Sequence, residues 1–394
     1  MKFIPIDYSR QKGIVRFLFV FLFYFDFFIT LLPMWSASPL YAFVSPEVLG
    51  RIWLLSSLGI LIACGFFILI NQRRIYNKLV VGSVVIVYLF YLFSITINGF
   101  KSGSIAILGI PISFFIMFDT IKQYKFGERH LNFIFYLLLA WSFTPLILCI
   151  IPSLRYSFFL TPEGGYTTFS GFAIHRNFYG ILLGVLYLLL CVKKMSFLLK
   201  FLLLSILLFC MILSASRTAI ISCIAITCAL IYYSESIKKK TKVIFFAVTI
   251  ILSSVIYWIL TNPEFSMREI DEDSGREDII TGFIELIQNS PFWGYGEEVT
   301  YYSRLFPNGA IAHNFLLQTT ANYGIFVTLS FVILLVIVFY YSQPFSKIIL
   351  LYLIIWGLTQ PYFGFGAFSP HVLIPMFVGY FLDNNMSSMQ KNRF

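Results

Sequence analysis

Charged residues are scarce in this sequence. They make up 12% of the 394 residues, whereas 59% of the residues are hydrophobic. A water-soluble globular domain carries about 25% charged residues. The shortage of charge therefore excludes an ordinary soluble protein and directs attention to the apolar segments.

Residue patterns that bind metals or form disulfides are also missing. The six cysteines all lie within apolar segments, and no pair has metal-ligand spacing near a histidine, so we expect neither a disulfide framework nor a zinc site. The acidic stretch DEDSGRED, residues 271–278, does not fit an EF-hand calcium loop, because Gly275 and Arg276 occupy the wrong positions. We predict no metal and no cofactor.

Long apolar runs, in contrast, recur throughout the chain. Most approach 20 residues, the length that crosses about 30 Å of hydrocarbon. We predict an all-α, polytopic integral membrane protein with about twelve transmembrane helices in a single membrane domain, residues 1–394. The predicted spans lie near residues 17–34, 49–70, 79–97, 104–120, 131–151, 172–192, 201–215, 218–234, 243–260, 325–341, 348–360 and 371–382.

Basic residues gather in alternate connecting segments. Clusters stand near Lys78, Lys193 and Lys239, and both chain ends are basic as well. Because positive residues mark the cytoplasmic side of a membrane protein, both termini are predicted to be cytoplasmic. The net charge of +10 then reflects topology, and no nucleic acid is expected as a partner.

Two external loops are longer than the others, at residues 152–176 and 261–312. Long ordered loops usually carry function. The second loop holds ten acidic residues and three arginines. Its residues 277–287 have apolar side chains at helical spacing, which predicts an amphipathic helix lying on the membrane or on the bundle. The segment SPFWGYG, residues 290–296, is typical of a tight turn.

Three arginines on the external side are candidates for binding an anion. Arg217 lies between two apolar spans, beside small residues that let helices approach closely; it is either a fixed anion-binding fork or an arginine reaching lipid headgroups. Arg276 stands among acidic residues, where a salt-bridge cluster is the alternative. Arg176 begins a span between His175 and Asn177, a position suited to an anion, and the alternative is again a headgroup contact.

His313 is the candidate proton acceptor. It closes the long loop, and Asn314, Gln318 and Asn322 recur every four residues after it, which predicts a polar stripe at the opening of the next span. An imidazole with a pKa of about 6.5 accepts a hydroxyl proton near neutral pH. The alternative is a structural histidine.

Four segments together resemble the bacterial O-antigen polymerase and O-antigen ligase superfamily. They are GFAIHRNFYGILLG (171–184), LSASRTAIIS (213–222), SGREDIITGFIELIQNSPFWGYG (274–296) and HNFLLQTTANYGIF (313–326). Each segment is weak evidence by itself, but the four stand in the family's order. The chain departs from the family at His175 and Arg176, where relatives more often carry Asn-Pro.

The resemblance implies a lipid-dependent, GT-C-like glycosyltransferase of the bacterial inner membrane. Its site would face the periplasm, with the large loop between the ninth and tenth spans. Arg217, Arg276 and His313 match the family's two arginines and its histidine, and are the predicted catalytic residues. Residues predicted to bind substrate are His175, Arg176, Asn177 and Asn314.

The implied partners are an undecaprenyl-diphosphate-linked glycan donor, a glycan acceptor and membrane lipids, together with a chain-length regulator and a flippase. The segment HNFLLQTTANYG, residues 313–324, resembles polymerases more than ligases, so we expect a polymerase of O-antigen or capsular repeat units. An O-antigen ligase is the alternative. A bicarbonate-like solute transporter is a second alternative, which would need polar residues near mid-membrane.

Overall fold

The structure, a computed structural model, describes most residues between 78 and 383. The described residues are 78–99, 128–160, 168–173, 175–234, 237–245, 247, 276–296, 299–304, 306–307, 309–360 and 374–383, with single positions 21, 24, 25, 27, 28, 31, 48, 52, 55 and 59. The predicted span near 104–120 and nearly all of those near 17–34, 49–70 and 243–260 lie outside this set. The first part of the predicted loop 261–312 lies outside it as well.

The described part of the chain is mostly helical, as predicted. Its helices are α3 (Lys78–Asn98), α5 (Glu128–Leu148), α6 (Arg176–Val192), α7 (Phe197–Leu213), α8 (Arg217–Tyr233), α10 (Arg276–Asn289), α11 (Phe315–Tyr323), α12 (Ile325–Tyr341), α13 (Pro344–Thr359) and a last helix, Ile374–Asp383. Two short strands, β1 (Phe159–Leu160) and β2 (Thr168–Phe169), form an antiparallel pair within the predicted loop 152–176.

Two helices are long and apolar enough to cross a membrane by length and composition, Lys78–Asn98 and Arg129–Leu148. Six further apolar helices are shorter, between 10 and 17 residues. Each of these eight helices falls on a predicted span. The helices are therefore compatible with an all-α membrane protein, while the number of about twelve spans stays a prediction.

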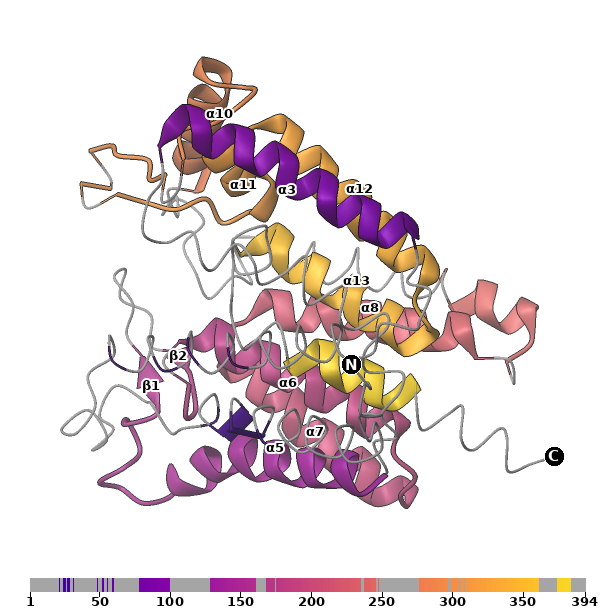
Figure 1. The fold of residues 1–394 in the computed structure, drawn as a ribbon. Coiled ribbons are helices and arrows are strands. Elements are labelled where there is room, and N and C mark those ends of the chain that lie inside the picture. The colour runs from indigo at the N-terminus through magenta and orange to yellow at the C-terminus, as the bar shows by residue number, and fades with distance from the viewer. Residues whose placement is uncertain are drawn as a thin grey trace, which may run out of the picture.

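Helices that are far apart in the sequence lie side by side along the bundle (Figure 1). α3 runs along α12, α13 lies against α8, and α6 contacts α5, α7 and α8. α10 and α11 lie at the end of the bundle where α6 and α8 begin and α13 ends, and we call this the loop end. Lysines gather at the opposite end, which we call the lysine end: Lys78, Lys193, Lys194, Lys200, Lys238, Lys239, Lys240, Lys242 and Lys347.

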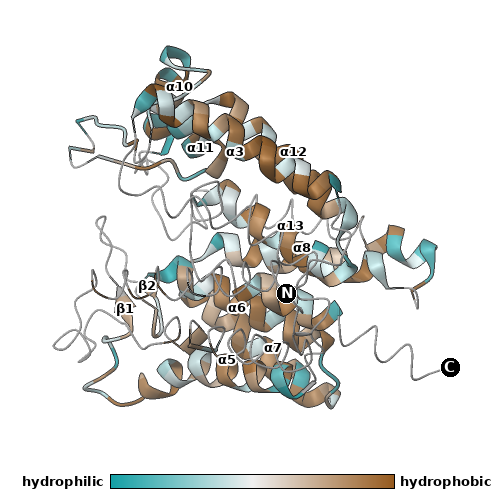
Figure 2. Ribbon diagram, in the orientation of Figure 1, coloured by the Kyte–Doolittle hydropathy of each residue, from teal (hydrophilic) through white to brown (hydrophobic). Residues whose placement is uncertain are grey.

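Hydrophobic residues run along most of the length of the helices (Figure 2), and their side chains lie on the outside of the bundle as well as in its interior. Leu182 and Leu186 of α6 are fully buried, whereas Phe197 and Leu198 of α7 are 84% and 76% exposed. A soluble bundle would place polar residues on its outer faces. This outer surface is suited to lipid.

Contacts between segments that are distant in the sequence stabilise the lysine end. The Lys193 side chain, just after α6, donates to Asn132 of α5 and lies 4.6 Å from the centre of the Phe135 ring. The Asp383 carboxylate accepts from the backbone N–H groups of Phe345 and Ser346, both at 2.8 Å. It thereby caps the first turn of α13, whose N–H groups have no partners within the helix.

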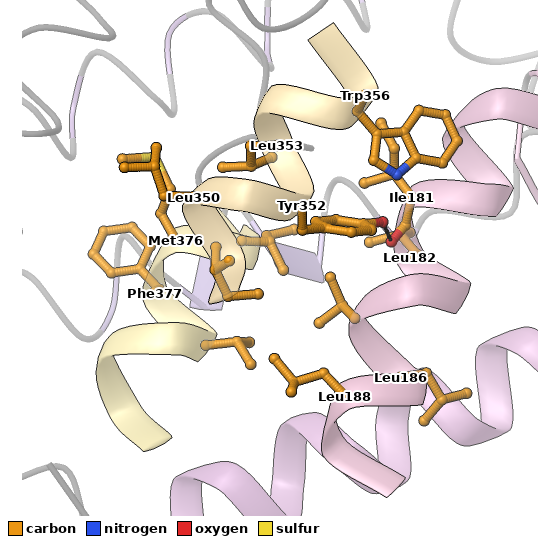
Figure 3. Packing of buried hydrophobic residues seen from close by; sticks show 14 of the residues in the cluster. Ile181, Leu182, Leu186, Leu188, Leu350, Tyr352, Leu353, Trp356, Met376 and Phe377 are labelled. Carbon is orange, nitrogen blue, oxygen red and sulfur yellow. Dashed lines mark hydrogen bonds between the residues drawn. The ribbon is translucent and has the colours of Figure 1, made fainter. Parts of the chain in front are cut away.

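The interior is packed around α6 and α13 (Figure 3). These helices approach closely at Gly184, where a Cβ atom would lie only 2.5 Å from the Tyr352 hydroxyl. That hydroxyl donates to the Ile181 carbonyl at 2.5 Å, which gives a buried polar group its partner. α13 is therefore held firmly along its length, so that its last turn has a defined place at the loop end.

The turn at residues 290–296 fits against the junction of α11 and α12. The backbone N–H groups of Tyr295 and Gly296 donate to the carbonyls of Ala321 and Asn322 at 3.0 and 2.8 Å, which satisfies the end of α11. Gly324 then breaks the chain direction with φ +86° and ψ 173°. The predicted turn is present, whereas His313 does not lie at the opening of a span: it precedes the short helix α11, and α12 begins only after Gly324.

Replacing Gly324 by alanine should destabilise the protein. Its backbone conformation is one that only glycine adopts readily, at a cost of about 1–3 kcal/mol for other residues, and a Cβ would overlap the Phe292 carbonyl group. We expect a clear fall in the thermal unfolding temperature in detergent. Gly82→Ala is the control, because a Cβ at Gly82, inside α3, meets nothing within 4 Å. Equal unfolding temperatures for the two variants would contradict this account of the junction.

Candidate functional site

The site begins at the first turn of α6, where His175 is the N-cap. Its Nδ1 accepts from the backbone N–H of Asn177 at 3.2 Å. Burial lowers the pKa of His175, and the positive charge of Arg176 lowers it further, as does His313 when it is protonated. Two segments separated by more than a hundred residues, the start of α6 and the segment before α11, are therefore close enough to interact electrostatically.

Arg217 is the first residue of α8 and is exposed. Residues 214–216 join α7 to α8 in a tight turn that includes Ala215 at φ +48°. The start of α6 approaches this turn, since a Cβ at Gly180 would lie 2.7 Å from the Ser216 Oγ. Small residues at this approach bring Arg217 to the same end of the bundle as His175.

Asn314 is the N-cap of α11. Its side-chain oxygen accepts from the backbone N–H groups of Leu316 and Leu317, at 2.8 and 3.3 Å, and its Nδ2 donates to the Leu358 carbonyl at 3.3 Å. Asn314 therefore fixes the start of α11 against the end of α13. Whether Asn314 also binds substrate, as predicted from the sequence, is not tested by these contacts.

His313, directly before this cap, is solvent-accessible. Partial desolvation by the surrounding protein lowers its pKa, and the positive charge of Arg276 lowers it further, while a hydrogen bond with the Gln360 side chain acts in the opposite direction. The net effect keeps the imidazole neutral at pH 7. Arg276, Gln360 and His175 come from α10, α13 and α6, so three elements meet around His313.

α10 carries Arg276 at its first position. Ile279 and Phe283 on its inner face pack with Ala312 and Ala321 in a small apolar cluster separate from the main core. Asp278 in the first turn accepts from Ser303 Oγ at 2.8 Å. The predicted amphipathic helix is therefore confirmed, and it packs on α11 and the loop that leads to it.

The last turn of α13 joins the two halves of the site. Thr218, next to Arg217, donates from its Oγ1 to Thr359 Oγ1 at 2.9 Å. Asn314, next to His313, donates to the carbonyl of the preceding residue of α13, Leu358. The segments that carry Arg217 and His313 are thus attached to consecutive residues of one helix.

Gln360 and Thr359 were not among the site residues predicted from the sequence. A glutamine directly before Pro361 at the end of an apolar span was the available signal for Gln360. Gln318, a member of the predicted polar stripe after His313, has a structural role. Its side-chain amide accepts from the Ala312 N–H at 2.8 Å and donates to the Val299 carbonyl at 2.9 Å. Gln318 thereby ties the loop before His313 to α11.

The structure allows a direct check of the charge around His313. Replacing Arg276 by glutamine removes a positive charge, so the pKa of His313 should rise from its lowered value towards the ordinary value of about 6.5. The pH dependence of His313 modification by diethyl pyrocarbonate, read by mass spectrometry, measures this pKa. Arg304→Gln, an exposed arginine later in the same loop, is the control. A midpoint that does not move in Arg276→Gln would contradict the electrostatic effect of Arg276 on His313.

Metal ligation has no support in the part of the chain that the structure describes, since no three His, Cys, Asp or Glu side chains there come together as a metal site. The groups that act on His313 include the Arg276 guanidinium and the Gln360 amide, while the nearby carboxylate of Asp278 in α10 accepts from Ser303. The guanidinium is suited to an anionic ligand and the imidazole to accepting a proton.

A family model described as O-Antigen ligase matches residues 201–332, from α7 to the middle of α12. The matched range contains Arg217, Arg276, His313 and Asn314, whereas α6 precedes it and α13 follows it. A comparison with curated proteins found no significant match.

Proposed function

We propose that this chain, which its residues 201–332 place in the O-antigen ligase and polymerase superfamily, polymerises undecaprenyl-diphosphate-linked oligosaccharide repeat units. The superfamily consists of membrane-embedded bacterial proteins of glycosyl transfer. The proposal goes further in three respects: it assigns the polymerase reaction, the O-antigen or capsular repeat unit as substrate, and the roles of individual residues.

The observation that carries the proposal is the meeting of His313 with cationic groups at one end of the bundle. Arg276 acts on His313 electrostatically. Arg217 lies next to Thr218, and His313 lies next to Asn314; Thr218 and Asn314 both hydrogen-bond the last turn of α13. A lipid-linked sugar diphosphate needs these two kinds of group. Cations bind its phosphate oxygens, and a base receives the proton of the attacking hydroxyl.

In the proposed reaction, an acceptor hydroxyl oxygen attacks the anomeric carbon of the donor sugar. The bond between that carbon and the phosphate oxygen breaks, the bonding pair leaves with the diphosphate, and the hydroxyl proton passes to His313. Arg217 and Arg276 stabilise the charge that grows on the leaving diphosphate. A single displacement of this kind inverts the anomeric configuration.

The electrostatics of His313 are suited to this role. A base must be unprotonated before it reacts, and the lowered pKa keeps the imidazole neutral at pH 7. Arg176, with His175 and Asn177 at the start of α6, is proposed to hold a further part of the substrate together with Asn314. The helix N-terminus there favours a negatively charged group.

We further propose that the loop end faces the periplasm and the lysine end the cytoplasm, in the bacterial inner membrane. The gathering of lysines at one end supports this orientation, because positive residues mark the cytoplasmic side. The proposal includes cytoplasmic termini and a GT-C-like bundle of about twelve spans. A flippase would deliver the substrate, and a chain-length regulator would act on the product.

An O-antigen ligase is the second candidate, because the family model that matches residues 201–332 carries that description. The two enzymes differ in the acceptor, which is another lipid-linked repeat for a polymerase and lipid A-core for a ligase. The diphosphate and the base are needed in both. The acceptor-binding residues therefore decide between the two candidates.

A deletion strain complemented with the wild-type gene distinguishes them. For a polymerase we expect loss of polymer, with single repeats still attached to the core. Accumulation of lipid-linked polymer that is never attached would instead identify a ligase. Normal polymer, normally attached, in the deletion strain would contradict both.

A further inference from the structure

We propose that the Tyr302 ring is a platform on which a sugar ring of the acceptor glycan stacks. Tyr302 belongs to the loop between α10 and α11, and its side chain is 64% exposed. The assignment to the acceptor rests on the proposed function. The geometry that presents the ring does not depend on that function.

Hydrogen bonds hold the backbone around Tyr302. Tyr301 and Ala310 form an antiparallel bridge, in which the N–H of each residue donates to the carbonyl of the other at 2.8 Å. Between them the chain turns back, and the Gly309 N–H donates to the Phe306 carbonyl at 3.0 Å. Tyr302 therefore follows directly after a paired residue, in a segment whose path is fixed by hydrogen bonds.

The residues on either side of Tyr302 are directed toward α10. The Tyr301 ring covers Gly282 of α10, and its hydroxyl donates to one oxygen of the Asp278 carboxylate at 3.3 Å. Ser303 Oγ donates to the other oxygen of this carboxylate at 2.8 Å. Because successive side chains of an extended segment point to opposite faces, Tyr302 points away from α10, in agreement with its exposure.

Gly309 supports the ring from behind. A Cβ atom at Gly309 would lie 2.9 Å from Cε1 and 3.0 Å from Cζ of Tyr302, so the ring rests against bare backbone. The ring is therefore held in place while most of its surface is exposed. An aromatic ring that is already held loses little conformational entropy when a ligand stacks on it.

The face that carries Tyr302 continues to His313. Exposure alternates along the segment after the supporting glycine: Ile311 is 44% exposed, Ala312 only 1%, and His313 is exposed again. Gly309 therefore shares a face with Ile311 and His313. The four residues from Gly309 to His313 span at most about 14 Å. An oligosaccharide of a few sugars that places a hydroxyl at His313 can thus also reach Tyr302.

The exposed ring matches the chemistry of a sugar. One face of a pyranose carries several C–H groups, which are apolar and slightly positive, whereas the face of an aromatic ring is slightly negative. The acceptor is the sugar assigned to this platform, because His313 receives the proton of the acceptor hydroxyl in the proposed reaction. Stacking on Tyr302 orients that hydroxyl without any contact with the diphosphate.

The test compares Tyr302→Ala and Tyr302→Phe in the full-length protein in nanodiscs. Tyr302→Ala removes the ring, so we expect KM for the acceptor repeat to rise about tenfold, the equivalent of one aromatic contact, with kcat changed by less than about twofold. Tyr302→Phe keeps the ring and should stay within about twofold of the wild type. Tyr340→Ala is the matched control, because Tyr340 is 73% exposed and lies at the lysine end.

Binding of the glycan alone separates this inference from the proposed function. The repeat-unit oligosaccharide, released from its lipid by mild acid, is added to each purified variant, and its binding is measured by saturation-transfer NMR. We expect Tyr302→Ala to bind it about tenfold more weakly than the wild type and Tyr302→Phe. If this pattern holds while no variant elongates a lipid-linked glycan, the platform stands and the proposed function fails. Equal binding by the wild type and Tyr302→Ala, including no binding by either, would overturn the platform; a ring that only anchors the loop in the membrane gives this result.

Discussion

His313→Ala is expected to reduce glycosyl transfer by about 10²–10⁴-fold, the usual contribution of a positioned general base. The imidazole is accessible, feels the positive charge of Arg276, and is kept neutral at pH 7 by its surroundings. Its loss leaves the acceptor hydroxyl without a proton acceptor while the diphosphate-binding groups are intact. The defect should therefore appear mainly in kcat.

The rate of polymer formation by purified protein in lipid nanodiscs measures this effect. His130→Ala is the matched control: it removes an imidazole from the start of α5, at the lysine end, where Nδ1 pairs with the Tyr24 hydroxyl. We expect the control to retain transfer. Comparable activity of His313→Ala and His130→Ala would remove the assigned role from His313.

Arg217→Ala and Arg276→Ala are expected to reduce transfer by about 10²–10³-fold each, the effect of removing one group that stabilises developing charge. Lysine at either position should recover part of the activity, because it restores the charge without the bidentate geometry of guanidinium. Arg304→Ala, an exposed arginine in the same loop as Arg276, should have little effect.

The double variant Arg217→Ala/Arg276→Ala separates cooperation from independent action. If both guanidinium groups bind one diphosphate, the combined loss should be smaller than the product of the single losses, because residues that act as a unit are not additive. A combined loss equal to that product would indicate that the two arginines act on different charges. Wild-type rates in either single variant would contradict the assignment of that residue.

The positions of the helices could be predicted from the sequence, and so could the candidate site residues at their ends. The predicted span 325–341 coincides with α12, and the others that fall in the described residues agree with observed helices to within a few residues. Long apolar runs determine these elements through burial and lipid contact alone, so no tertiary information is needed. The sequence also shows a glycine at position 324. Its positive φ and the break before α12, however, depend on the turn at 290–296 that packs against it.

Contacts between distant segments could not be predicted in this way. Nothing near Gln360 in the sequence indicates that it acts on His313, and nothing near Gln318 indicates that it holds Val299 and Ala312. Both are amides whose partners are defined only once α11 and α13 are packed. The direction of the His313 pKa shift has the same origin, since it depends on Arg276 from α10.

The reaction itself tests the central claim most directly. Purified protein in lipid nanodiscs is given synthetic undecaprenyl-diphosphate-linked repeat units, without nucleotide sugar, and the products are separated and their new glycosidic linkage is analysed by NMR. The account predicts a ladder of longer lipid-linked glycans, release of undecaprenyl diphosphate, and inverted configuration at the new linkage. A folded protein that yields no elongated glycan, or one that retains the configuration of the donor, would contradict it.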